Sequence, residues 1–566
     1  MSQPGASAAA RAGPGQLALR RLILYGLLFA LVVITAVGLS GLLDRLLSGD
    51  AVLVSADVTE LARALAFTLI GGPLAALLWW VVWRRLDDGT ERSSVGWGLH
   101  LSAVYAVSLI VSVTALLATA ASLIGPLGSR WSSSLSTGLV WLLVWAWHRW
   151  MFRHPTKSPT SLDDVPVVVG SVYGLLLGTF FAIAALGGLL DVALRGFTSL
   201  VPDTGSWWQP VLRALVWAAG GALVWWWHWY PGGGRRLYTP LAQIALVGVG
   251  IFTAGLLALG AAGTALFVLL RTAFDRTDPM GEVLAPLGPA VAAAAIGALV
   301  WRYHRVIADS HSIRTRRAGV LVTSGVALAA AASGIGVIIN ATLAITVSPL
   351  VGSGSRTLLL AGLSSLAVGG PVWWLSWQPA SRPRDAGSIP PGRRIYLVAV
   401  FGVSAVVALI ALLVIGYRLF EFVLGDVSGG SVVDRIRGPL GLLVAAALVA
   451  GYHFALWQRE RVLPADASPG RGPAIERVTL VAGPAYDGLS RSVAQATGAK
   501  VTAWRRTDAS TDAVAAEGSP RDEVARRVAE ALAGITARHV LVVLAPAADE
   551  EIGIHVIPVE PGGRAS

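Results

Sequence analysis

The stretch Trp225-Trp226-Trp227-His228 closes a long apolar segment and recurs, in altered form, five more times in the first 460 residues. The other copies are Trp80-Val81-Val82-Trp83, Trp145-Ala146-Trp147-His148, Trp301-Arg302-Tyr303-His304, Trp374-Leu375-Ser376-Trp377 and Ala450-Gly451-Tyr452-His453. In chain order, the first residues of the six copies are 65, 80, 76, 73 and 76 positions apart. So regular a spacing indicates an internal repeat, which predicts the architecture before any other motif is considered.

The composition indicates a membrane protein. Hydrophobic residues make up 55% of the sequence, charged residues only 14%, and there are 22 tryptophans. A soluble protein cannot bury so much apolar surface, so an integral protein of the cell membrane is expected, with the lipid bilayer as its surroundings. The sequence contains no cysteine, which excludes disulfides, thiol nucleophiles and thiolate metal sites.

The net charge of +11 comes almost entirely from arginine, since Lys157 and Lys500 are the only lysines. The cations cluster at the ends of apolar runs, which is typical of charges that set membrane topology. The sequence shows neither a basic helix nor a basic patch interleaved with aromatic residues. No nucleic-acid partner is therefore expected.

Each repeat contains two apolar runs long enough to cross a bilayer, which predicts twelve transmembrane helices in six hairpins. The first helices are expected at about 20–47, 96–124, 165–194, 237–270, 318–347 and 395–424, and the second at 58–83, 133–150, 207–230, 283–306, 356–377 and 437–457. The hairpins then occupy 20–86, 93–153, 165–230, 235–306, 314–377 and 393–461, after a disordered tail at 1–19. The first apolar run is too long for the core of a signal peptide, so it is expected to remain as a membrane helix.

The loops predict how these helices are oriented. Arginines crowd the connections between hairpins, for example Arg84, Arg85, Arg316 and Arg317, whereas the connections within hairpins carry more acids. By the positive-inside rule, the aromatic endings and both termini are cytoplasmic. Because each hairpin has two spans, all six enter the membrane in the same sense, as parallel repeats around an axis near the membrane normal.

The composition changes after the last hairpin. Residues 462–474, rich in Pro, Gly and Ala, are expected to form a linker, and residues 475–566 a soluble cytoplasmic domain. Strands are predicted at 478–482, 500–505, 539–544 and 552–559, and helices at 487–497 and 521–535. The fold class is therefore an all-α polytopic membrane protein with a small C-terminal α/β domain.

The histidines of the aromatic endings are the first candidate site. His148, His228, His304 and His453 each lie one helical turn after an aromatic or small residue, and convergence on the repeat axis would make a metal or proton site. The alternative is an interfacial belt, because Trp, Tyr and His favour the headgroup level of a bilayer. Trp83 and Trp377 replace histidine in two repeats, which a belt tolerates more readily than a site, so the belt is favoured.

Acidic residues near the ends of the first helices are the second candidate. Asp44 and Asp191 close matching Gly-Leu-Leu-Asp sequences, and Glu421 lies at a comparable depth in the sixth hairpin. A carboxylate within a membrane indicates function by default, and a ring of them would form a pore mouth or an ion site. Pairing with nearby arginines at the outer interface is the simpler interpretation and the favoured one.

The soluble domain offers two weaker candidates. The turn from Gly483 to Gly488 would present backbone amides to an anion, but an ordinary strand-to-helix turn with Asp487 as the N-cap is the favoured interpretation. The acids Asp549, Glu550 and Glu551 precede the last strand and are expected in a solvated turn, with weak cation binding as the alternative. Neither segment has the spacing of a phosphate-binding loop or a dinucleotide fingerprint, so no cofactor is predicted.

The two-helix units, each with a Gly/Leu-rich span and a Trp-x-x-His ending, resemble a bacterial multi-span membrane family known as a domain of unknown function. The resemblance covers about residues 20–460 and omits the C-terminal domain; Trp83 and Trp377 depart from its pattern at the histidine position. It implies the fold and the location of the chain but assigns no activity and no catalytic residue.

Two functions follow as expectations. The first is a non-enzymatic membrane scaffold or sensing protein, with the cytoplasmic domain as the module that contacts a protein partner. The alternative is a transporter or channel with a path along the repeat axis. Polar residues lining one continuous cavity would favour the alternative.

Overall fold

The computed structural model divides the chain into two compact units, and each is described by itself. One unit comprises Met1–Arg382 with Pro390–Arg459, and the other Pro383–Ile389 with Glu460–Ser566. The residues that the structure describes are 14–48, 58–125, 131–198, 206–275, 278–347, 354–381, 391–425 and 431–462, followed by 475–483, 489–490, 493–494, 499–506, 521–532, 535, 537–546 and 552–559.

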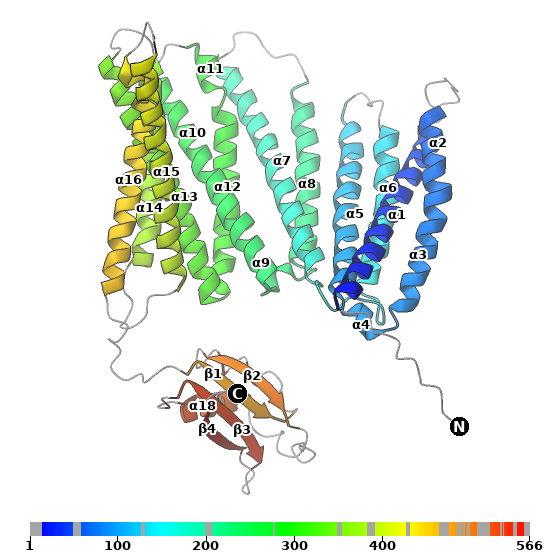
Figure 1. Ribbon diagram of the computed structural model, residues 1–566. Coiled ribbons are helices and arrows are strands. Elements are labelled where there is room, and N and C mark those ends of the chain that lie inside the picture. Colours follow the sequence, from blue (N-terminus) through cyan, green and yellow to red (C-terminus); the bar gives the residue numbers. More distant parts are fainter. Residues whose placement is uncertain are drawn as a thin grey trace, which may run out of the picture. The chain divides into compact units, whose positions relative to one another are not determined.

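In the described residues, chain order divides the long helical segments of the helical unit into three groups of four. Figure 1 shows these segments side by side. The first group comprises α1 (Pro14–Ser48), α2 (Val58–Ala66) with η2 (Phe67–Gly71) and α3 (Gly72–Arg85), then the short α4 (Gly89–Arg92), α5 (Val95–Ser122) and α6 (Trp131–Met151). The middle group comprises α7 (Val165–Thr198), α8 (Trp208–Trp229), the turn η3 (Gly234–Arg236), α9 (Pro240–Ala245) with η4 (Leu246–Thr253) and α10 (Ala254–Phe274), and α11 (Met280–Leu284) with α12 (Leu287–Ser310). The last group comprises α13 (Ile313–Val347), α14 (Gly354–Ser381), α15 (Pro391–Leu424) and α16 (Val432–Val462).

The predicted class of helical membrane protein is confirmed. Among the described residues, ten helices are long and apolar enough to cross a membrane. The other two predicted spans are also helical, but they are the tryptophan-rich α6 and α8, which do not reach that level of hydropathy. The count of twelve spans therefore stays a prediction. Helix α1 begins at Pro14, within the stretch predicted as a tail.

Close glycine contacts hold neighbouring helices together. Helix α7 contacts α8 and α12 in the middle group. A Cβ added to Gly221 of α8 would lie 2.3 Å from the backbone nitrogen of Gly178 in α7, and one added to Gly174 would lie 2.3 Å from the nitrogen of Trp225. Small residues allow this approach. In a bilayer the resulting van der Waals packing stabilises the helix contact, because the hydrophobic effect does not drive helices together there.

Successive groups also contact each other, and arginine hydrogen bonds lie at the junctions. Helix α5 of the first group contacts α7 and α8, and α10 of the middle group contacts α13 and α14. At the first junction Arg213 donates to the carbonyl of Ile124 at 2.6 Å. At the second, Arg356 donates to the carbonyl of Phe274 at 3.4 Å. In both cases an arginine near the start of one helix caps the C-terminal carbonyls of another, which its charge favours.

The four strands predicted for the C-terminal unit are present, and in the described residues they form one mixed sheet. Strands β1 (Arg477–Ala482), β2 (Lys500–Arg505), β3 (His539–Pro546) and β4 (Ile552–Val559) lie in the order β2-β1-β3-β4. Strand β1 is parallel to β2 and β3, and β4 is antiparallel to β3. Helix α18 (Arg521–Leu532) buries its apolar side on one face of the sheet, with Leu489 and Val493 from the predicted 487–497 helix in the same core.

A candidate ligand site beside the buried histidines

All four histidines of the aromatic endings are buried. Their exposed fractions are 2% for His148, 4% for His228, 3% for His304 and 0% for His453. The preference for an interfacial belt is therefore wrong for these residues. Tryptophans such as Trp80 and Trp226, which are about half exposed, supply the outward-facing aromatic surface instead.

The four imidazoles adopt one hydrogen-bonding arrangement. Each Nδ1 lies 2.7–2.8 Å from the carbonyl oxygen four residues earlier in its helix, namely that of Val144, Val224, Val300 or Val449. Because a carbonyl only accepts, Nδ1 must carry a hydrogen. In the neutral ring, Nε2 is then left as a hydrogen-bond acceptor.

The histidines do not gather at a common axis, because they lie in different groups. His148, His304 and His453 belong to the fourth long segment of the first, middle and last group, and His228 belongs to the second segment of the middle group. No ring contact joins any two of these four within the described part of the chain. Nor do the described residues contain a group of three or more His, Asp or Glu suited to a metal ion.

His228 instead links two groups. Its Nε2 lies 2.8 Å from the hydroxyl of Tyr105 in α5, and both residues are buried. Since Nε2 is the acceptor, the tyrosine hydroxyl donates this bond. The pair joins the first group to the middle group in an interior where an unpaired polar group would be costly.

The three other histidines lie in equivalent clusters. In each group, a tryptophan of the second segment packs against the residue that precedes the histidine. The ring centroids are 5.9 Å apart for Trp79 and Trp147, 5.6 Å for Trp225 and Tyr303, and 5.8 Å for Trp373 and Tyr452. The indole Nε1 atoms of Trp79, Trp225 and Trp373 are all buried without a hydrogen-bond partner. Each cluster therefore contains a free donor.

The clusters differ at one position in the third segment. His100 lies against His148 with ring centroids 6.2 Å apart, and Tyr396 lies against His453 at 6.0 Å. The corresponding residue of the middle group is Gly250, where an added Cβ would lie 2.6 Å from the His304 ring. The middle group thus lacks the aromatic ring that fills this place in the other two.

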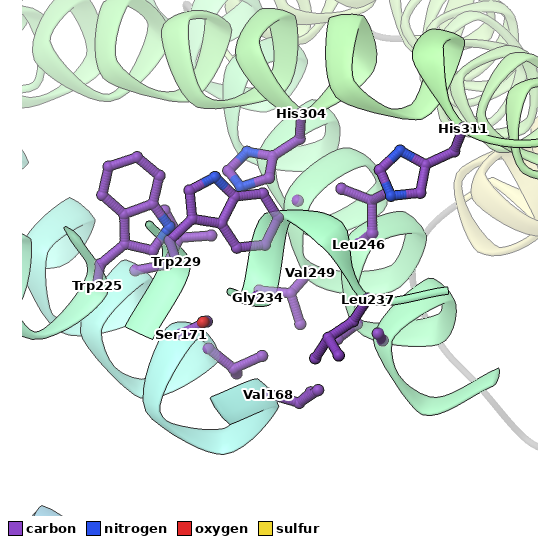
Figure 2. Close-up of a pocket in the computed structure, with 15 residues that line it drawn as sticks. Val168, Ser171, Trp225, Trp229, Gly234, Leu237, Leu246, Val249, His304 and His311 are labelled. Atoms are coloured by element: carbon purple, nitrogen blue, oxygen red, sulfur yellow. The ribbon is translucent and has the colours of Figure 1, made fainter. Parts of the chain in front are cut away.

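A cavity of about 30 Å³ lies beside Gly250. Figure 2 shows the indoles of Trp225 and Trp229 and the imidazole of His304 around it, with Ser171 across from His304. The Ser171 hydroxyl is buried without a partner, as is the Trp225 Nε1. This volume is enough for one or two water molecules or a small polar group, and the free donors give such a group its contacts.

The wall of the cavity has an unusual backbone. Gly250 lies in η4, a π-helical segment of eight residues between α9 and α10. Thr239 is the N-cap of α9, where its hydroxyl accepts a hydrogen bond from the amide of Ala242, and Pro240 lies in the first turn. A π-helical turn is wider than an α-helical one and is often found at functional sites.

A wider recess adjoins the cavity and shares Trp229 and His311 with it. Its volume is about 390 Å³, and its other lining residues are Tyr230, Arg235, Arg236, Tyr238 and Ser310. Neither Arg235 nor Arg236 forms an ion pair with a described carboxylate. The recess therefore combines two free cations with aromatic faces and has no acidic lining residue.

None of the three acidic candidates lines this cavity. Asp44 accepts a hydrogen bond of 2.7 Å from Ser132 in α6. Asp191 lies against Gly288 in α12, where an added Cβ would be 2.3 Å from its Oδ1. Glu421 forms an ion pair of 3.0 Å with Arg418. Glu421 thus has the kind of arginine partner that the sequence favours, whereas arginine pairing of Asp44 and Asp191 stays a prediction.

Of the two candidates in the soluble domain, only Gly483 lies within the described residues, where it is buried. Residues 484–488 and 549–551 lie outside them. The motif search also missed His100, Gly250 and the pair Arg235 and Arg236, because none belongs to an aromatic ending. No sequence signal marks Gly250; its equivalence with His100 and Tyr396 follows from the fully buried Leu101, Ile251 and Leu397, each of which comes one residue later.

Comparison with known proteins finds matches to one protein-family model. Residues 21–147 and 317–448 each match the model of the family described as Domain of unknown function (DUF5671). The predicted resemblance to a domain of unknown function is thereby confirmed. The two matches cover the first and the last group of helices, so the matched unit has four long segments, twice the predicted hairpin. No significant match was found among curated proteins or solved structures.

Proposed function

We propose that this membrane protein is a non-enzymatic sensing protein that binds a small organic anion in the middle group and presents its C-terminal domain as an interaction module. The observation that carries the proposal is the cavity at Gly250, together with the cationic recess that adjoins it at Trp229 and His311. The first and last groups fill the same place with the rings of His100 and Tyr396.

The lining residues define the class of ligand. Arg235 and Arg236 favour a phosphate or carboxylate, because the guanidinium fork matches both in geometry and charge. Trp229, Tyr230 and Tyr238 favour a planar or apolar body beside the anion. A volume of about 390 Å³ lies within the range of small-molecule sites.

The experiment measures binding of phenyl phosphate to the full-length protein in nanodiscs of neutral lipid, with inorganic phosphate and phenol as the two partial probes. We expect phenyl phosphate to bind at least about ten-fold more tightly than either, since both halves of the ligand are recognised. Replacing Arg235 and Arg236 together by Ala should remove the preference for the anion. Arg20→Ala, which changes an exposed cation of α1, serves as the matched control.

A second pair of variants tests the cavity itself. Gly250→Ala places a methyl group against the His304 ring and should weaken binding of phenyl phosphate about ten-fold or more. Gly248→Ala, in the same π-helical segment, meets nothing within 4 Å and should leave binding unchanged. Equal affinity of both variants and the unaltered protein would refute a ligand site at Gly250.

The alternative function is a transporter or channel. Measuring the flux of phenyl phosphate across the membrane distinguishes it from the proposed sensing protein. One polar contact between helices supports sensing: Asn340 of α13 accepts a hydrogen bond of 3.0 Å from Arg437 of α16, and such pairing favours a packed bundle. Proteoliposomes loaded with phenyl phosphate should retain it under the proposal. Release that depends on the protein, and that Gly250→Ala slows, would favour transport instead.

A further inference from the structure

One face of the C-terminal sheet is covered by helices and the other is exposed. The covered face consists of alternating buried residues such as Val478, Leu480, Val540 and Val542, which share one core with α18. Because side chains alternate along a strand, the residues between them point to the opposite face. Trp504 is 64% exposed and Ile557 is 47% exposed on that face.

The register of the strands places the residues of the exposed face in three rows. One row contains Lys500, Arg477, His539 and Val559, the next Thr502, Thr479, Leu541 and Ile557, and the third Trp504, Val481, Val543 and His555. No acidic residue is present in any of the three rows. The face therefore has cations at one end, an exposed indole at the other and aliphatic or hydroxyl side chains between them.

We propose that this face docks on the anionic surface of the membrane in which the helical unit lies. Cations beside an exposed aromatic and aliphatic surface suit a lipid headgroup layer, since the cations meet acidic headgroups and the indole favours the interface. The proposal does not depend on the ligand site of the middle group.

The length of the connecting chain supports the membrane as the occupant. Helix α16 ends at Val462 and strand β1 begins at Arg477, so fourteen residues separate them. A chain of that length spans at most about 50 Å. The domain is thus held near one leaflet, where the effective concentration of lipid surface is high and weak contacts suffice for binding.

The absence of cysteine from the sequence allows a single thiol reporter in the full-length protein. Thr502→Cys places an environment-sensitive fluorophore in the middle row of the exposed face. Glu530→Cys places the same probe on α18, where the glutamate side chain is 61% exposed, and serves as the matched control. Both variants are reconstituted at one copy per nanodisc, in phosphatidylcholine alone or mixed with phosphatidylglycerol.

We expect the probe at position 502 to shift to shorter wavelength only in discs that contain phosphatidylglycerol, and the probe at position 530 not to respond. Reversing two charges with Lys500→Glu and Arg477→Glu should reduce the docked fraction at least about ten-fold, and high salt should act in the same direction. Hydrogen exchange at the amides of β3 shows whether these variants keep the fold, because both side chains lie outside its core.

Three results would overturn the proposal. Equal probe signals at position 502 in neutral and acidic discs would show that the anionic surface is not recognised. A shift that needs two protein copies per disc would assign the face to self-association. A shift produced by a short RNA in neutral discs, with no response to phosphatidylglycerol, would assign it to nucleic acid.

Discussion

The indole Nε1 of Trp377 donates a hydrogen bond of 2.8 Å to the hydroxyl of Tyr452. Trp229 and Tyr303 form the same bond at the same distance in the middle group. The two tryptophans therefore occupy equivalent positions, and His228 precedes that position by one residue. Trp377 is not a substitute for histidine, as the alignment of the aromatic endings assumed, but a residue with its own partner.

The Trp377–Tyr452 bond predicts a stability effect. Tyr452→Phe leaves the indole Nε1, in a residue that is only 2% exposed, without an acceptor and should lower the free energy of unfolding by about 1 kcal/mol. The double variant with Trp377→Phe should lose less than the sum of the two single losses, because the second substitution removes the donor that the first leaves free. A double-mutant cycle of unfolding in detergent measures the coupling. Tyr417→Phe, at a tyrosine that is 64% exposed, should cost little.

The contact between α7 and α8 predicts a strong effect of one methyl group. Gly221→Ala would place a Cβ 2.3 Å from the backbone of Gly178, so the helices must separate, at a cost of about 2–3 kcal/mol. Gly260→Ala in α10 meets nothing within 4 Å and should be neutral or slightly stabilising. Thermal unfolding of the two variants in one detergent tests the difference, and similar melting temperatures would contradict the predicted packing.

The bond between Tyr105 and His228 predicts that the first and middle groups unfold together. Tyr105→Phe removes the donor to a buried Nε2 and should cost about 1–3 kcal/mol. Hydrogen exchange should then rise in both α5 and α8. Tyr238→Phe, at a tyrosine that is 62% exposed, provides the comparison. Faster exchange in α5 alone would show that the bond does not couple the two groups.

Asp88 predicts a local response to acid. Its carboxylate accepts the backbone N–H of Thr90 at the start of α4, and this bond lowers the pKa of Asp88 below its usual value of 3.8. The stabilisation is complete above pH 3.8 and is lost as the pH falls through the lower pKa of the folded state. Hydrogen exchange at Thr90 should therefore accelerate in that range. Asp88→Asn, which keeps an acceptor but does not titrate, should remove the pH dependence.

Several features were predictable from the sequence because they depend on local composition. The helical segments follow from apolar runs between loops rich in Arg, Gly and Pro, and the strands of the C-terminal domain follow from alternating valine and leucine. The sequence also showed the internal repeat, but it did not show which residues of the copies are equivalent. The Trp-x-x-His spacing aligned Trp377 with His228, whereas the hydrogen bond to Tyr452 aligns it with Trp229.

The candidate site could not be predicted, because it arises where the middle group has a glycine in place of an aromatic side chain. Gly250 is one of 64 glycines and carries no chemical signal in the sequence. Its role appears only when α12 brings His304 against it, and when His100 and Tyr396 are seen to fill the same place in the other groups. Arg235 and Arg236 likewise resembled topology-setting charges until the recess beside Trp229 was known.

The repeated aromatic endings show both what the sequence determines and what it does not. The sequence by itself determined that they close apolar helices of a membrane protein, since a bilayer requires long apolar segments whose backbone groups bond internally. Only the tertiary structure decided that His148, His228, His304 and His453 face the interior. The direction of a side chain depends on which helix packs against it, and glycine contacts between distant segments set that packing.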